Sequence, residues 1–206
     1  MSEIVDKVRD WLAGMTGVRK VPDILPHPGG PGVVTLDIPA YSQTQSHTCG
    51  FTAGLMILHY FRPKASAERF YACVSPDPVT DASNRRLIRA LRMHGISVTP
   101  RNGLDFEGIA SAIDSGKPIA VTVRTRRKDT HHWTVVYGYG RDPKRIYLAG
   151  NGFPVLCEKE YAWQRFRMRL WVPAGFGLVC NRRKHGAGSS GNMSKASPYR
   201  RPAAMK

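Results

Sequence analysis

Cys49 is the residue of this sequence whose surroundings most clearly indicate chemistry. It precedes Gly50 at the start of an apolar segment and follows the polar residues 43–48. A thiol becomes a strong nucleophile only as the thiolate, which a nearby base, a positive charge or a helix N-terminus favours. Since the chain offers such groups, we expect enzyme chemistry at Cys49 rather than the simple packing of a small buried side chain.

Glutamines just before Cys49 are candidates for stabilising negative charge. Gln43 lies six residues upstream, and its carboxamide N–H could stabilise a developing oxyanion, with the Cys49 backbone N–H as second donor. Gln45, on the same loop, is the second candidate for this role. His47 lies beside the nucleophile and could line a cleft.

A pair of histidines opens an alternating segment far downstream, and one of them is the candidate base. Side chains alternate between the two faces of a strand, so only one of His131 and His132 can face Cys49. We expect this to be His132, because a base must reach the thiol and carry its proton. His59 lies nearly three helical turns beyond Cys49 and is too far along the helix axis to act on it.

A third residue should orient the histidine through its other ring nitrogen. Asn151, between two glycines, follows the strand expected to pair with the His132 strand, and it is the first candidate. Asparagine between glycines is also common in plain turns. Asp142 and Asp129, both expected in turns, are therefore kept as alternatives.

The elements expected to position these residues form an α+β fold, with helices followed by an antiparallel sheet. Apolar periodicity and turn signals predict an N-terminal helix, a buried helix from Cys49, and two further helices. Alternation and short apolar runs predict strands after and between them. The predicted helices cover 3–15, 49–61, 83–94 and 104–114, and the strands cover 33–39, 96–99, 118–123, 132–139, 145–149, 167–172 and 176–180.

Length and composition indicate one catalytic domain with extensions at both ends. The 206 residues suit a domain at 33–180, preceded by a helix and a Pro/Gly-rich linker at 1–32. Residues 181–206 are basic, lack acidic residues, and are expected to be a disordered tail. The net charge of +16 suits an anionic partner such as nucleic acid, bound through this tail.

The remaining composition argues against several classes of protein. The 4 cysteines show no CxxC spacing, so neither a disulfide framework nor a zinc site is expected, and we expect no metal or other cofactor. No apolar run approaches the roughly 20 residues that span a bilayer. The first residues do not form a signal peptide. We expect a cytoplasmic protein, with delivery by a signal-less secretion route as the alternative.

Over residues 36–155 the sequence resembles the papain-like cysteine peptidases, specifically the peptidase C39-like group, to which the bacteriocin-processing peptidases of double-glycine leaders belong. The glutamine, cysteine and histidine stand in the order of that family. The matching segments are Gln43 to Cys49-Gly50, Leu58-His59-Tyr60-Phe61, Leu87-Ile88 through Gly95-Ile96, Gly116-Lys117-Pro118-Ile119, His132 to Tyr139, and Ile146-Tyr147-Leu148-Ala149.

The resemblance implies a papain-like fold in which Cys49 is the nucleophile and His132 the general base and then acid. It also implies Gln43 as oxyanion-hole donor and Asn151 as orienting residue. Two departures stand out. The family usually has Asp-Pro after the last strand, where this chain has Gly150-Asn151, and Phe51 replaces the proline common after Cys-Gly.

Three functions follow as hypotheses. The first is a thiol hydrolase that cleaves a peptide or isopeptide bond through an acyl-enzyme, with a protein or peptide substrate. The second is a transferase or deamidase effector on the same scaffold. The third is an inert papain-like scaffold that binds an anionic partner, for which binding should weaken steeply with salt.

Overall fold

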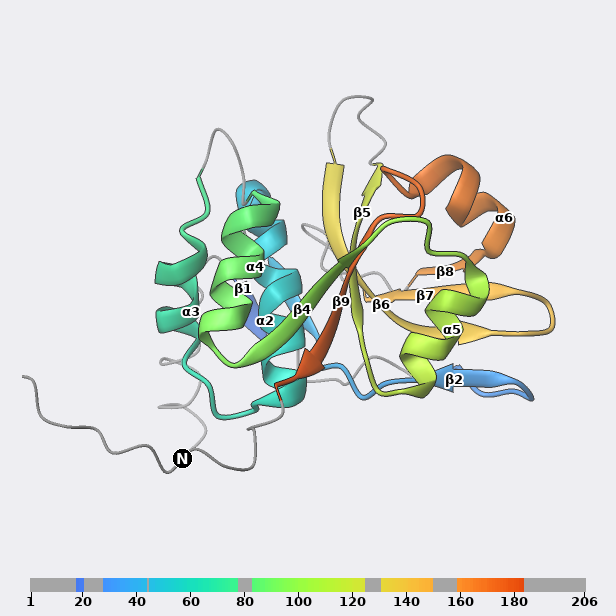
Figure 1. The fold of residues 1–206 in the computed structure, drawn as a ribbon, viewed down its shortest axis with the longest axis horizontal. Helices are drawn as coiled ribbons and strands as arrows, with labels where there is room; N and C mark the ends of the chain where they lie inside the picture. The colour runs from blue at the N-terminus through green and yellow to red at the C-terminus, as the bar shows by residue number, and fades with distance from the viewer. Residues whose placement is uncertain are drawn as a thin grey trace, which may run out of the picture.

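Three helices lie on one side of an antiparallel sheet (Figure 1). The computed structural model describes residues 18–20, 28–43, 45–77, 83–124, 131–149 and 159–183. The predicted helix at 3–15, most of the linker at 22–32, and the tail from residue 184 lie outside these ranges. Within them, the helices are α2 (Cys49–Phe61), α3 (Ala67–Val74), α4 (Asn84–Met93) and α5 (Phe106–Asp114), with short turns α6 (Trp163–Arg165) and η2 (Phe166–Leu170).

The main sheet has the order β4-β9-β5-β6-β7-β8, and β2 pairs with β6 off this path. Every pairing is antiparallel, and with the helices this confirms the predicted α+β fold. Its strands are β2 (Val33–Thr35), β4 (Ile96–Arg101), β5 (Ile119–Arg124), β6 (His131–Gly140), β7 (Arg145–Ala149), β8 (Lys159–Ala162) and β9 (Gly177–Arg182).

Helix α2 is the centre of the packing and begins at Cys49, as predicted. Its residues 49–58 are all buried, as expected of a helix that is apolar on every side. It packs against β6, β3 (Tyr41–Gln43), α3 and α4. Gly54 permits the close approach of α3 and α4, because a Cβ there would lie 2.6 Å from Leu87 Cδ1 and 2.9 Å from Phe70 Cζ.

Local capping signals fix the other helices. The Ser83 hydroxyl accepts the Arg86 N–H at 3.3 Å to start α4, and Asp105 accepts the Gly108 N–H at 2.8 Å to start α5. Gly95, with a φ of 77°, follows α4 in the left-handed region that favours glycine. These two helices were predicted, whereas α3 and the strand β8 were not.

The strand predicted at residues 167–172 is wrong. Arginines alternate with apolar residues there, which imitates a strand, but the chain forms the turns α6 and η2 instead. Phe166 is buried and stacks on Trp171 with ring centroids 5.1 Å apart, while Met168 is 76% exposed. Phe166 and Trp171 therefore pack on each other. In a strand, two residues five positions apart would point to opposite faces of the sheet.

We predict that Gly138→Ala destabilises the fold by about 2–3 kcal/mol. A Cβ at this position would lie 2.6 Å from Thr35 Cγ2 and 2.7 Å from the Val34 carbonyl oxygen, and the backbone oxygen cannot move aside without disturbing the β2–β6 pairing. Urea unfolding monitored by circular dichroism measures the effect. Gly29→Ala is the matched control, since nothing lies within 4 Å of its added Cβ, and equal midpoints for the two variants would contradict the prediction.

Candidate active site

Cys49 occupies the first position of α2 and is 2% exposed. The 3-10 turn η1 (Ser46–Thr48) leads into it, and the Thr48 hydroxyl donates to the Gln45 carbonyl at 2.9 Å instead of capping the helix. The first turn of α2 also carries no acidic residue. No side chain of the described residues caps the start of the helix, so its positive dipole end lies at Cys49 and favours a thiolate at this position.

Gln43 ends β3 and is 3% exposed, whereas Gln45 is exposed at the surface. Because β3 packs against α2, the strand carries the Gln43 side chain into the interior beside the helix. The two glutamines thus differ in burial, with Gln43 in the interior beside α2 and Gln45 at the surface.

His59, in the last turn of α2, is linked to β3 by a hydrogen bond. Its Nδ1 is hydrogen-bonded to the Tyr41 hydroxyl, and its Nε2 donates to the Ala65 carbonyl at 2.9 Å. Burial raises the pKa of Tyr41 to about 12, so the hydroxyl keeps its proton and can donate it to Nδ1. Both ring nitrogens are engaged, and His59 is a structural residue, in agreement with the sequence prediction that it does not act on Cys49.

A short strand, β1 (Val18–Lys20), pairs with β3, the strand that ends at Gln43. The pairing is antiparallel and places Val18 opposite Gln43 and Lys20 opposite Tyr41. No local pattern predicts this strand, because it has only three residues and its pairing partner lies more than 20 positions away. Gln43 is consequently held through its backbone as well as by the packing of its side chain.

His132 is the second residue of β6 and lies opposite Val123 of β5. Its side chain is half-buried, whereas that of His131 is exposed, which matches the prediction that only one of the two points inward. α2 packs against β6, and the first turn of α2 and the start of β6 lie toward the same, upper end of the molecule in Figure 1. The fold thus brings the elements that carry Cys49 and His132 together at one end.

The candidates for the third residue are distributed differently. Asp142 is exposed in the turn beyond the far end of β6, about 27 Å of strand from His132, so it cannot orient the imidazole, and this alternative is wrong. Asn151 and Asp129 lie outside the described residues. Strand β7 ends at Ala149, whose carbonyl accepts the Thr134 hydroxyl at 2.5 Å, so the chain enters residue 150 close to the histidine end of β6.

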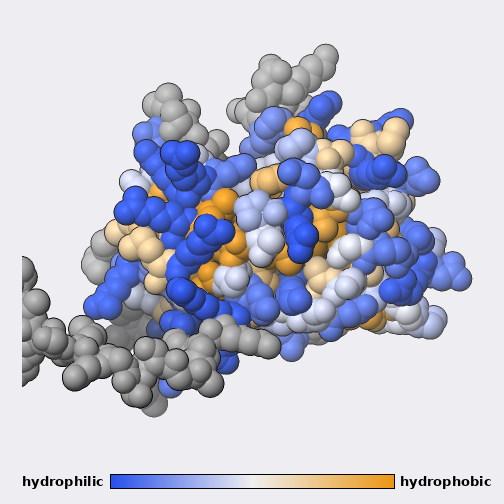
Figure 2. All heavy atoms as spheres, viewed as in Figure 1, coloured by the Kyte–Doolittle hydropathy of each residue, from blue (hydrophilic) through white to orange (hydrophobic). Residues whose placement is uncertain are grey.

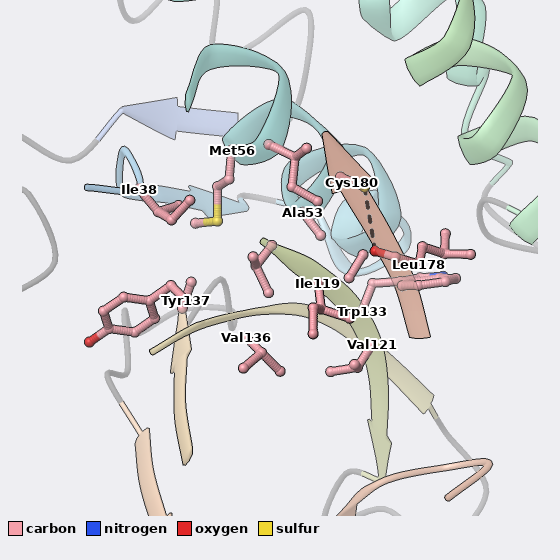
Figure 3. Close-up of a cluster of buried hydrophobic side chains, with 14 of the residues drawn as sticks. Ile38, Ala53, Met56, Ile119, Val121, Trp133, Val136, Tyr137, Leu178 and Cys180 are labelled. Carbon is pink, nitrogen blue, oxygen red and sulfur yellow. Dashed lines mark hydrogen bonds between the residues drawn. The ribbon is translucent and has the colours of Figure 1, made fainter. Parts of the chain in front are cut away.

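A hydrophobic core packs beneath the candidate site, between α2 and the sheet. Figure 3 shows Ala53 and Met56 of α2 over the strands that carry Trp133, Leu178 and Cys180. The Cys180 thiol donates to the Leu178 carbonyl at 3.4 Å, and its complete burial raises its pKa to about 12. Cys180 is therefore a packing residue that cannot form a thiolate near neutral pH.

The described residues form neither a metal site nor a membrane-spanning helix. In these ranges no group of three or more His, Cys, Asp or Glu side chains is arranged to hold a metal ion. None of the helices described in the structure combines the length and the hydropathy needed to cross a bilayer.

The fold of this chain is similar to that of several solved peptidase domains. A protease of the double-glycine motif from an AMS/PCAT transporter, solved with its leader peptide, aligns over 72% of this chain and 94% of its own, with a TM-score of 0.54 and 14% identity. The peptidase domain of Streptococcus ComA, a bifunctional ABC transporter involved in quorum sensing, aligns over 72% and 98%, with a TM-score of 0.52 and 14% identity.

A third solved structure, from Bacillus anthracis and described as a C39-like peptidase, covers 73% of this chain and 98% of its own, with a TM-score of 0.56 and 14% identity. No curated protein matches the chain at a significant level. A sequence model of the peptidase C39-like family matches residues 35–171, which hold both Cys49 and His132. The chain therefore belongs to the peptidase C39-like family and has the papain-like fold.

Proposed function

We propose that this protein is a cysteine peptidase that cleaves a peptide or isopeptide bond through an acyl-enzyme on Cys49. The observation that carries the proposal is the position of Cys49 at the start of a buried helix, which packs against the strand whose second residue is His132. Membership of the C39-like family supports the same assignment. One relative of similar fold was solved with a leader peptide, which supports a peptide as the substrate.

In the proposed reaction, His132 takes the thiol proton of Cys49 and the thiolate attacks the scissile carbonyl carbon. The oxygen of the tetrahedral intermediate carries the negative charge and accepts hydrogen bonds from the Gln43 carboxamide and the Cys49 backbone N–H. The intermediate collapses as the C–N bond breaks, and His132 gives its proton to the leaving amine. Water, deprotonated by His132, then hydrolyses the thioester and restores the thiol.

Asn151 is proposed to hold the His132 ring through its second nitrogen. Its support is the end of β7 at Ala149, which is paired with Val135 three residues from His132. An asparagine would fix the orientation of the ring through a hydrogen bond. Because it carries no charge, it would stabilise the imidazolium less than an aspartate does.

The pH dependence of alkylation by iodoacetamide tests the activated cysteine directly. We expect Cys49 to react well below the unperturbed thiol pKa of about 8.5, and to lose this reactivity in His132→Ala. Cys180 serves as an internal control, since its pKa of about 12 should keep it unreactive in the folded protein. Peptide mapping by mass spectrometry assigns each label, and an ordinary Cys49 titration would overturn the proposal.

Gln43→Ala should lower kcat by about 10²–10³-fold, because one donor to the oxyanion is lost. Gln45→Ala is the matched control and should change kcat less than about twofold, since this side chain is exposed. Steady-state kinetics on a peptide cleaved by the wild type measures both variants. Equal losses for the two glutamines would contradict the assignment of Gln43.

A further inference from the structure

The outward face of α4 combines positive charge with exposed apolar side chains. Arg85, Arg89 and Arg92 follow one another at the spacing of a helix face, and Ile88 and Met93 lie among them. Together with Asn84 these residues line a shallow open hollow on the surface. Met93 is 62% exposed, so its apolar side chain forms part of this surface.

The positive charge of this face is not neutralised within the described part of the chain. Helix α4 itself contains no acidic residue. The ion pairs that the described residues show lie elsewhere, where Glu107 binds Arg141 and Lys144, and Glu160 binds Arg145. Arg92 donates to the Val98 carbonyl at 2.8 Å, which holds its guanidinium at the edge of the hollow without cancelling its charge.

The apolar component decides which anionic partner fits. Figure 2 shows apolar surface between the hydrophilic side chains over α4 and β4. Single-stranded nucleic acid bound without sequence preference uses basic side chains with aromatic rings for stacking, and α4 carries no aromatic residue. Carboxylates pair well with guanidinium groups, and methionine adapts its shape to an apolar side chain. These features match an acidic peptide that also carries apolar residues.

We propose that the outward face of α4 is a docking surface for an acidic, amphipathic peptide segment of a partner protein. Carboxylates of the segment pair with Arg85 and Arg89, and its apolar side chains cover Ile88 and Met93. The surface is separate from Cys49 and does not depend on the chemistry proposed there.

Fluorescence anisotropy tests this proposal with the full chain carrying Cys49→Ala, so that bound peptide is not cleaved. The probe is a fluorescein-labelled peptide with glutamates and leucines at helical spacing. We expect saturable binding that falls roughly tenfold or more in Arg85→Glu/Arg89→Glu, since two charge-assisted contacts are lost. Both positions are exposed, and circular dichroism checks that the fold is retained.

Arg167→Glu/Arg169→Glu is the matched control, because it makes the same change in net charge at exposed positions of η2. We expect it to change the affinity less than about twofold, and we expect Met93→Ser to weaken binding without any change in charge. Equal losses in the two double variants would show attraction by net charge alone and overturn the proposal. So would the absence of saturation, or tighter binding of single-stranded RNA that the α4 variant abolishes.

Discussion

Replacing Cys49 with alanine should abolish peptide cleavage, with a loss in kcat on the order of 10⁶-fold. The substitution removes the only atom that can form the acyl-enzyme, and the residual site can do no more than bind substrate and polarise its carbonyl. The fold should survive, because the change removes one sulfur atom from a site that is 2% exposed and introduces no polar group. Turnover of a peptide cleaved by the wild type measures the loss, and thermal unfolding checks the stability.

Cys73→Ala is the matched control for this variant. Cys73 lies on α3 and is half-buried, so its replacement should leave turnover within about twofold of the wild type. Mass spectrometry of rapidly quenched reactions should reveal a thioester on the wild-type enzyme and none on Cys49→Ala. Full activity of Cys49→Ala would end the peptidase proposal, whatever the behaviour of Cys73→Ala.

Replacing His132 with alanine should be the second most damaging change, with a loss in kcat of about 10⁴-fold or more. Without the imidazole the thiol keeps its proton near neutral pH, and no acid protonates the leaving amine. Activity should recover in part as pH rises through the ordinary thiol pKa of about 8.5, because hydroxide then generates the thiolate. The wild type should show no such dependence in the same range.

His131→Ala tests whether the strand directs one histidine inward. The two residues are adjacent in β6, yet His131 is exposed and His132 is half-buried. We therefore expect His131→Ala to keep most of the activity and the wild-type pH profile. If His131→Ala is inactive instead, His131 rather than His132 faces Cys49, and the prediction is wrong.

Two of the helices that the sequence predicts, α4 and α5, have both an apolar period and a cap in the chain itself. Helix α2 is apolar throughout, and α4 and α5 each begin at a Ser or Asp that accepts a backbone N–H. Helix α3 had comparable signals that were missed, since Ser66 caps it through the Arg69 N–H and Phe70 and Val74 are buried one turn apart.

The errors arise where long-range packing decides the local structure. Residues 166–170 alternate like a strand, and only the contacts of Phe166 with Trp163 and Trp171 explain why they coil. The strand β1 depends in the same way on β3, which no local pattern reveals.

At the candidate site, residue type and order predict Cys49, His132 and Gln43, and their catalytic roles stay predictions. The difference in burial between Gln43 and Gln45 could not be predicted from the sequence. Asp142 was a reasonable alternative in the sequence and fails only because a ten-residue strand separates it from His132. The role of Asn151 stays a prediction.

The hydrogen bonds of His59 link β3, the strand that carries Gln43, to α2, the helix that carries Cys49. Cys49 belongs to α2 by the covalent chain, and the strand that ends at Gln43 is attached to the same helix through Tyr41 and His59. His132 instead belongs to the sheet. A small displacement of α2 along the sheet would therefore change the separation of Cys49 and His132 while leaving that of Cys49 and Gln43 unchanged.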